Sequence, residues 1–369
     1  MSVIVAKLGS STLVDADGEL RADVLEARVR DLVRLRRQGH RPILVSSGAI
    51  ACGLGRLGIG DWPTALPDLQ AASAVGQGVL FQRYLESFTA HSVTPAQVLL
   101  TSADLEERSS YLNARNTLAR LLDLGVVPVV NENDTTATDE LTFGDNDVLA
   151  AQVAILMSAT WLVLLTDRDG LYGVGAEGAP ALIGDVPAAT RPEDVPLADM
   201  RGSGLGRGGV SSKIAAATMA TGAGVTCVIA SGRTDGVLGA VASGHHIGTR
   251  FAPSDRREPA FKLWLRYAKP ALGRIRVDAG AARALRRQGT SLLAVGVSGV
   301  DGTFLAGDAV EVDDADGRCV GKGISAFSAD DLRQVVGMKT DELLRVFPDA
   351  GIEVVHRDRF VLAETPGSP

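Results

Sequence analysis

Residues 126–134 read Val-Val-Pro-Val-Val-Asn-Glu-Asn-Asp, an apolar run that changes abruptly into amides and carboxylates. The apolar part predicts a buried strand. The polar part continues through a loop to Gly-Asp-Asn-Asp at 144–147, after which a helical pattern begins. Open α/β sheets bind their ligands in loops that follow strands, whereas a short Asx pair more often makes a local turn. So many Asn and Asp residues in one loop favour a binding site.

Strand and helix signals alternate on both sides of this stretch. Strands are predicted at 3–8, 42–45, 97–100, 126–130, 161–165 and 225–229, and helices at 23–38, 70–90, 111–124, 148–157 and 214–221. Strands alternating with helices indicate a parallel sheet that is covered on both faces. The chain is therefore expected to be α/β, with a three-layer αβα sandwich and a mainly parallel sheet.

The composition changes near residues 250–272, where a polar, proline-bearing segment is typical of a domain boundary. Beyond it, short strand candidates separated by glycines predict a small mixed-β module. These candidates lie at 274–277, 292–297, 309–312 and 319–324. The expected domains are a catalytic domain over 1–255, a linker over 256–270, the small module over 271–352, and a C-terminal segment and tail over 353–369.

Composition narrows the classes of protein. The chain has 369 residues, 46% hydrophobic residues and a net charge of −7, which argues against a general binder of nucleic acid or anionic membranes. It has no apolar stretch of the ~18 residues that could span a bilayer and no secretory leader pattern, so a cytoplasmic location is expected. Cys52, Cys227 and Cys319 lack metal-site spacing and are expected to be small core residues.

Two lysines lie within a few residues of glycines. Lys7 ends the first predicted strand and is followed by Gly9 and two serines, so its ammonium group would lie beside backbone N–H groups that suit a phosphate. Lys213 follows the glycine-rich segment 203–209 at the start of a predicted helix, although the spacing is not that of a Walker A loop. The alternative interpretation of Lys7 is a surface lysine before a turn. The alternative interpretation of the glycine-rich segment is a flexible loop.

Two further strand ends carry small polar residues. Ser46 and Ser47 precede Gly48 and a helix whose N-terminus could receive a carboxylate, though they could equally be an ordinary helix cap. Thr166 and Asp167 end another strand and could hydrogen-bond a nucleotide or simply make a turn. No Ser-His-Asp or Cys-His arrangement is visible, so positioning and charge stabilisation, as in phosphoryl transfer, are the expected chemistry.

Taken in order, these motifs resemble the amino-acid kinase family. The motifs are Lys7-x-Gly9-Ser10, Ser46-Ser47-Gly48-Ala49-Ile50, Asn131-Glu132-Asn133-Asp134, Gly144-Asp145-Asn146-Asp147, Thr166-Asp167-x-x-Gly170-Leu171-Tyr172 and Gly208-Gly209-x-Ser211-x-Lys213. The resemblance covers residues 3 to about 255. The segments 273–278 and 321–324 resemble the PUA domain that many such kinases carry.

The resemblance implies ATP-dependent phosphorylation of the side-chain carboxylate of L-glutamate at the start of proline synthesis, with Mg²⁺ bridging the ATP phosphates. The residues implied to hold glutamate are Ser47, Asp134 and Asn146. The residues implied to bind ATP are Lys7, Thr166, Asp167, Arg207, Gly208, Gly209, Val210, Ser211, Ser212 and Lys213. Lys7 and Lys213 would neutralise the transferring phosphoryl group, and Asp147 would orient them. No protein ligands for a metal are predicted.

The attacking carboxylate is already ionised at neutral pH, so no general base is required. The family often has Thr where this chain has Arg207, which leaves the role of that side chain open. The expected partners are further copies of the chain in a homo-oligomer, L-proline as a feedback inhibitor, and a downstream glutamyl phosphate reductase.

Three alternatives remain. A sister kinase could act on N-acetylglutamate, aspartate or carbamate, but the 131–134 loop and the second domain favour glutamate. An RNA-binding protein could also carry a PUA domain, yet acidic side chains outnumber basic ones over 271–352, which argues against nucleic acid. A regulatory protein without activity is the third, and the presence of Lys7, Asp147 and Lys213 argues against it.

Overall fold

The computed structural model describes residues 2–15, 18–137, 146–175, 178–197, 209–255 and 257–363. The chain divides into two compact units, Met1–Ala260 and Phe261–Pro369. Each unit has its own β-sheet and its own hydrophobic core. Within the described residues, no helix combines the length and the apolar character that crossing a membrane requires.

The first unit is built on an eight-stranded sheet with the order β3-β4-β2-β1-β5-β9-β10-β8. Its strands are β1 (Val3–Leu8), β2 (Arg41–Val45), β3 (Pro95–Leu100), β4 (Val127–Glu132), β5 (Trp161–Thr166), β8 (Asp185–Val186), β9 (Thr226–Ser231) and β10 (Thr249–Phe251). All neighbouring pairs are parallel except β9 and β10. A separate hairpin joins β6 (Tyr172–Val174) to β7 (Pro180–Leu182). The expectation of a mainly parallel sheet is confirmed.

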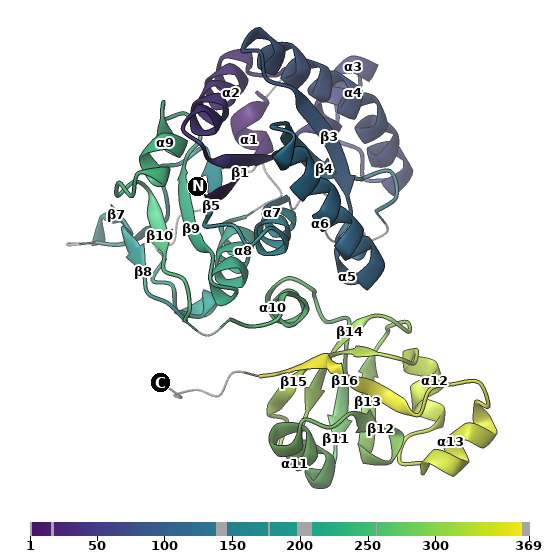
Figure 1. Cartoon of the computed structure of the whole chain (residues 1–369). Helices are drawn as coiled ribbons and strands as arrows, with labels where there is room; N and C mark the ends of the chain where they lie inside the picture. The colour runs from purple at the N-terminus through teal and green to yellow at the C-terminus, as the bar shows by residue number, and fades with distance from the viewer. Residues whose placement is uncertain are drawn as a thin grey trace. The chain divides into compact units, whose positions relative to one another are not determined.

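Helices cover both faces of this sheet (Figure 1). One face carries α2 (Ala22–Arg37), α3 (Ala49–Leu57), α4 (Leu66–Ala90) and α9 (Val237–Ala242), together with the short α1 (Ser10–Leu13). The other face carries α6 (Arg108–Asp123), α7 (Asn146–Leu156) and α8 (Val210–Gly222), and α5 (Ser102–Glu106) precedes α6. The three-layer αβα sandwich is therefore confirmed.

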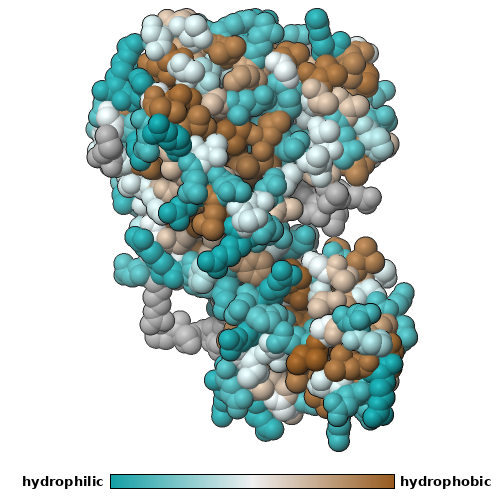
Figure 2. Space-filling model, turned by 45° about the vertical axis from the view of Figure 1, so that its right-hand side comes forward, coloured by the Kyte–Doolittle hydropathy of each residue, from teal (hydrophilic) through white to brown (hydrophobic). Residues whose placement is uncertain are grey.

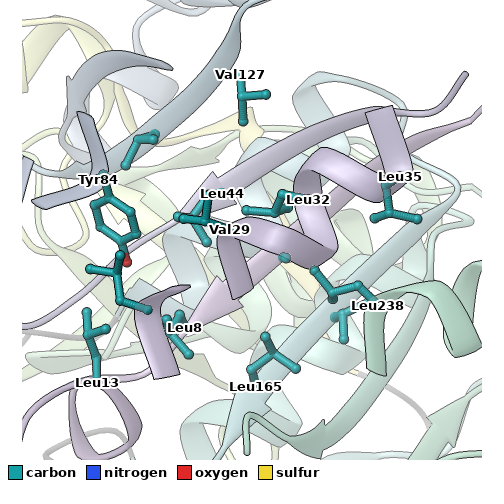
Figure 3. Close-up of a cluster of buried hydrophobic side chains, with 14 of the residues drawn as sticks. Leu8, Leu13, Val29, Leu32, Leu35, Leu44, Tyr84, Val127, Leu165 and Leu238 are labelled. Atoms are coloured by element: carbon teal, nitrogen blue, oxygen red, sulfur yellow. The ribbon is translucent and has the colours of Figure 1, made fainter. Parts of the chain in front are cut away.

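The core of the first unit follows from the alternation of side chains along each strand. Leu8 of β1 and Leu44 of β2 lie in one cluster with Val29 and Leu32 of α2, and Figure 3 shows these side chains together. All four are fully buried. Burial of each such side chain contributes about 1.5–3 kcal/mol, so the cluster anchors α2 on the sheet. Lys7, one residue before Leu8, points to the opposite face, where α7 lies.

The helices α3 and α4 pack so closely that glycine is required at the contact. A Cβ atom at Gly53 would lie 1.8 Å from the carbonyl oxygen of Ala72, and one at Gly76 would lie 1.8 Å from the carbonyl oxygen of Ala49. Because real Cβ atoms do not approach this closely, larger residues would force the helices apart. This contact fixes the position of α4 relative to the start of α3, next to Ser47 and Gly48.

Apolar side chains also reach the surface. Figure 2 shows hydrophobic residues in groups between hydrophilic ones on the face in view. Leu57, Ile59 and Trp62, at and after the end of α3, are among the exposed large apolar residues of the first unit. Exposed apolar residues of this kind are common in globular proteins and do not by themselves indicate a binding surface.

The second unit contains a six-stranded mixed sheet with the order β12-β16-β15-β14-β11-β13. The strands are β11 (Gly273–Val277), β12 (Leu292–Leu293), β13 (Val297–Gly302), β14 (Ala309–Asp313), β15 (Cys319–Ser325) and β16 (Glu353–Leu362). Only β11 and β14 pair in parallel. Its helices are α10 (Ala260–Tyr267), α11 (Ala279–Gln288), α12 (Ala329–Gln334) and α13 (Thr340–Val346). The small mixed-β module expected from the sequence is confirmed, with helices added.

Several local expectations differ from the structure. Residues 292–297 were expected as one strand, but β12 ends at Leu293 and a 3₁₀ turn over Ala294–Gly296 separates it from β13. The 256–270 segment contains α10 and is not only a linker, and β16 within 353–369 pairs with both β12 and β15. The apolar side chains Val354, Val355 and Phe360 of β16 join the core of the second unit.

Candidate active site

The ends of the parallel strands bring the polar motifs to one edge of the sheet. β1 lies between β2 and β5 in the sheet, with β4 beyond β2. Ser46 and Ser47 follow β2, Asn131 and Glu132 end β4, and Thr166 ends β5. The strand order reverses at β1, which is where open α/β sheets bind their ligands. Lys7 therefore lies between the amide-rich side and the Thr166 side of this edge.

One buried carboxylate holds both lysines. Asp147, at the start of α7, is fully buried, and its Oδ1 lies 2.7 Å from Nζ of Lys7. Its Oδ2 lies 3.1 Å from Nζ of Lys213 on α8 and accepts a 3.3 Å hydrogen bond from Ser212 Oγ. Residues distant in sequence thus form one cluster with two cations and one anion, and the remaining positive charge suits a phosphate group.

The ionisation of Asp147 depends on these lysines. Burial opposes the charged carboxylate, but the ammonium groups of Lys7 and Lys213 lower the pKa of Asp147 below its ordinary value. Asp147 is therefore ionised at neutral pH, and it can hold both ammonium groups at fixed positions.

An amide cluster lies beside this ionic cluster. Asn146 directly precedes Asp147, and its Nδ2 lies 2.9 Å from Ser46 O, 3.1 Å from Ser47 Oγ and 2.9 Å from Asn131 Oδ1, so these three acceptors share its two hydrogens. All four residues are buried. The ends of β2 and β4 are thereby tied to the start of α7, which makes a polar pocket wall from three chain segments.

Asp134 forms another part of the same wall. Its Oδ2 accepts a 2.6 Å hydrogen bond from Ser73 Oγ of α4, and the side chain is buried. Burial raises the pKa of Asp134, although the hydrogen bond from Ser73 partly opposes the shift. A carboxylate in this state is stabilised by any cation that enters, such as the ammonium group of an amino acid.

The sequence analysis did not single out the residues that α4 supplies to this region. Ser73 contacts Asp134, Gln77 contacts Asn131 and Glu132, and Tyr84 makes a 2.9 Å hydrogen bond with Ser46 Oγ. These polar side chains stand on the buried face of a helix, among Leu69, Ala72 and Leu80. Polar residues at such core-facing positions were the available signal, because buried polar groups need partners.

The opposite side of Lys7 carries the residues expected at a nucleotide. Thr166 is buried, and its Oγ1 donates to Oδ1 of the exposed Asp167 at 3.0 Å. Gly209, Val210 and Ser211 are exposed at the start of α8, on the chain leading to Lys213. Arg207 and Gly208 lie outside the described residues.

The cysteines and possible metal ligands form no additional site. Cys52 and Cys227 are buried, as expected, and burial raises the pKa of Cys52 to about 11. Cys319 is exposed, so the expectation of a core residue is wrong there. Across the described part of the chain, no group of three or more His, Cys, Asp or Glu side chains could hold a metal ion.

Both units of the chain are similar to known proteins. A model of the amino acid kinase family matches residues 2–231, and a model of the PUA domain matches residues 273–347. The chain is 45% identical to a protein named glutamate 5-kinase from Synechococcus sp. (strain JA-2-3B'a(2-13)), over 97% of this chain and 98% of that one.

Other relatives with the same name are similar over nearly their full lengths. One from Moorella thermoacetica is 45% identical over 97% of this chain and 96% of its own. One from Myxococcus xanthus is 44% identical over 96% and 94%. Among solved structures, one titled UMP kinase from Bacillus anthracis covers 68% of this chain and 96% of its own, with a TM-score of 0.46 and 14% identity.

Proposed function

This chain belongs to the amino acid kinase family, and we propose that it transfers the γ-phosphoryl group of ATP to the side-chain carboxylate of L-glutamate. The product is L-glutamyl 5-phosphate, the first intermediate of proline biosynthesis. Relatives named glutamate 5-kinase match over nearly the whole chain, including the second unit. The observation that carries the proposal is the cluster in which Asp147 holds Lys7 and Lys213 between two differently lined sides of one sheet edge.

Each side of the cluster receives one substrate in this proposal. Ser47, Asp134 and Asn146 hold glutamate, because their amide, hydroxyl and carboxylate groups suit an ammonium and a carboxylate. Thr166, Asp167 and the chain from Arg207 to Lys213 hold ATP, since exposed backbone at a helix start suits phosphates. The γ-carboxylate then faces the terminal phosphate across Lys7.

The reaction needs charge stabilisation more than proton transfer. The glutamate γ-carboxylate is ionised at neutral pH and attacks phosphorus directly, with ADP as the leaving group. Negative charge spreads over the transferring phosphoryl oxygens, and the ammonium groups of Lys7 and Lys213 neutralise it. Asp147 keeps both cations in place before the substrates arrive, so little reorganisation is required.

Mg²⁺ fits this site as a companion of ATP. The described residues contain no cluster of acidic or imidazole side chains that would hold a metal without the nucleotide. The phosphate oxygens of ATP are hard ligands that Mg²⁺ prefers, so the ion would be bound mainly through them. It would add positive charge next to the two lysines.

The remaining predictions rest on kinship with the family. They are feedback inhibition by L-proline, a homo-oligomeric state, a glutamyl phosphate reductase partner and action in the cytoplasm. Because proline has the ammonium and α-carboxylate of an amino acid but no side-chain carboxylate, it could occupy only the glutamate side of the site. Competition between proline and glutamate at constant ATP would test this first prediction.

The activity is tested by coupling ADP release to a spectroscopic signal with L-glutamate, N-acetylglutamate, L-aspartate and carbamate as acceptors. We expect kcat/KM to be highest for L-glutamate. ADP release that is independent of any acceptor, or a preference for one of the other acids, would contradict the proposed substrate.

A further inference from the structure

Three hydrogen-bonded side-chain amides, those of Gln77, Asn131 and Asn146, connect α4 to the polar wall proposed to bind glutamate. Gln77 Nε2 donates to the backbone oxygen of Glu132 at 3.1 Å, and Gln77 Oε1 accepts from Asn131 Nδ2 at 3.1 Å. Asn131 Oδ1 in turn accepts from Asn146 Nδ2 at 2.9 Å. The three side chains are at least nine-tenths buried. The hydrogen bonds therefore run in one direction, from Asn146 through Asn131 to Gln77.

The direction of this chain is fixed at both ends by backbone carbonyl groups. A carbonyl oxygen can only accept, so Glu132 O requires the NH₂ group of Gln77 and thereby turns its oxygen toward Asn131. At the other end, Ser46 O requires the NH₂ group of Asn146 at 2.9 Å. Both constraints give the same orientation of all three amides. Gln77 and Asn146 cannot flip without losing a bond to the backbone, and Asn131 cannot flip without losing its bonds to both of them.

In this orientation, one buried amide oxygen accepts no hydrogen bond from the described residues. Asn146 Oδ1 is buried and has no hydrogen-bond partner among the described residues. A buried acceptor without a partner is costly, so such a group at a binding site indicates a ligand that donates. Asp134 is a second buried acceptor in the same wall, and its raised pKa also favours a cationic donor. An ammonium group has only donors and satisfies both.

We propose that Gln77 is a positioning residue which, through Asn131, turns Asn146 Oδ1 toward the α-ammonium group of the substrate and so selects amino acids over simple dicarboxylic acids. The inference rests on the proposed function, because it assigns the part of glutamate that Asn146 recognises. Gln77 touches no substrate in this proposal. It acts from a helix whose position is fixed by the close contact at Gly76.

The test compares L-glutamate with glutarate, which has both carboxylates but no ammonium group. In Gln77→Met the side chain keeps its length but loses the donor and the acceptor. Methionine is unbranched and close to glutamine in size, so it can occupy the space that Gln77 fills beside Ser46 and Asn131. We expect calorimetry on the full chain to show that glutamate binds about tenfold more weakly, whereas glutarate affinity changes less than about twofold. The KM for ATP should be unchanged.

A matched control stands on the same helix. Gln82 is exposed, and among the described residues its side chain donates to Glu86 at 3.0 Å, away from the amide cluster, so Gln82→Met should leave both affinities unchanged. Equal weakening of glutamate and glutarate in Gln77→Met would show a general loss of packing and overturn the inference. Unchanged glutamate affinity would overturn it as well. If the wild-type chain neither binds nor phosphorylates glutamate, the proposed function itself fails.

A second variant covers the case in which Gln77→Met does not fold. Gln77→Glu still accepts from Asn131, but its ionised carboxylate cannot donate to Glu132 O. Protonation restores one donor, so glutamate affinity should recover as the pH is lowered from about 8 to about 6, a range in which glutamate keeps its charges. The wild type should show no such recovery. If the glutamate affinity of Gln77→Glu varied with pH in parallel with that of the wild type, the proposed role of Gln77 would be overturned.

Discussion

The close contact between α3 and α4 allows a paired test of how the fold positions the site. Gly76 and Gly78 lie two residues apart on α4. A Cβ atom at Gly76 would lie 1.8 Å from Ala49 O and 2.6 Å from Gly53 N, whereas one at Gly78 would meet nothing within 4 Å. Gly76→Ala and Gly78→Ala therefore make the same chemical change in the same helix. The new methyl group presses against α3 in the first variant and meets nothing in the second.

The magnitude follows from these distances. Both substitutions gain about 1 kcal/mol of helix propensity, so this contribution cancels between them. To bring the 1.8 Å approach to the 3.4 Å of ordinary contact, α3 and α4 must move apart by about 1.6 Å. Overpacking of this kind costs about 1–3 kcal/mol, and contact with rigid backbone favours the upper part of that range. The difference in melting temperature should be roughly 5–10 °C.

The same displacement should change substrate binding. Ser73 and Gln77 stand on either side of Gly76 along α4, and Ser73 Oγ lies 2.6 Å from Asp134 Oδ2. A shift of this size breaks that hydrogen bond, so Gly76→Ala should raise the KM for glutamate about tenfold or more and leave the KM for ATP unchanged. Thermal unfolding and steady-state kinetics measure both effects. Equal stability and equal KM values in the two variants would refute the reasoning.

Three further substitutions address the charged residues. Asp147→Asn should remove most turnover and destabilise the fold by about 3–5 kcal/mol, because it leaves the buried ammonium groups of Lys7 and Lys213 without a counter-charge; a loss below about 1 kcal/mol in urea unfolding would contradict this. Burial opposes ionisation of Asp147, but the lysines lower its folded-state pKa below the unfolded value, so its stabilising contribution is complete above about pH 4 and is lost as the pH falls further. Urea midpoints of Asp147→Asn should accordingly depend less on pH below about 4 than those of the wild type. Asp134→Asn should stabilise the ligand-free protein at neutral pH, because burial raises the pKa of Asp134 and makes its charge unfavourable. Scanning calorimetry should then show less added stability from glutamate than in the wild type, and equal added stability would remove Asp134 from the pocket. Lys213→Ala should lower kcat by about 10²–10³-fold with little change in the KM for glutamate, since a charge partner of the phosphoryl group is lost; near-normal turnover in stopped assays would exclude that role.

Much of the first unit could be predicted from local sequence. The runs at 3–8, 126–130 and 161–165 are almost continuously apolar, and each is a buried strand of the parallel sheet. Such runs identify strands because a sheet covered on both faces buries every side chain. The second unit was less predictable, since β16 has exposed residues in its middle and β12 has only two residues.

The residues of the candidate site also divide into those that local sequence could identify and those that it could not. Lys7, Ser47, Asp134 and Thr166 could be singled out because each lies at or just after the end of an apolar strand, next to small or polar residues. Ser73, Gln77 and Tyr84 could not, because each stands alone in a helical pattern that reads as a core-facing stripe. Only packing shows that this stripe faces the polar ends of β2 and β4.

The sequence alone determined the order of strands and helices, and with it the edge at which the polar motifs gather, because periodicity and strand ends are local properties. Tertiary structure decided which of those groups meet. The shared carboxylate of Asp147, the glycine contact between α3 and α4, and the direction of the amide chain through Gln77 all join segments far apart in the chain. Their geometry depends on the distances that packing sets, and no single segment of the sequence contains that information.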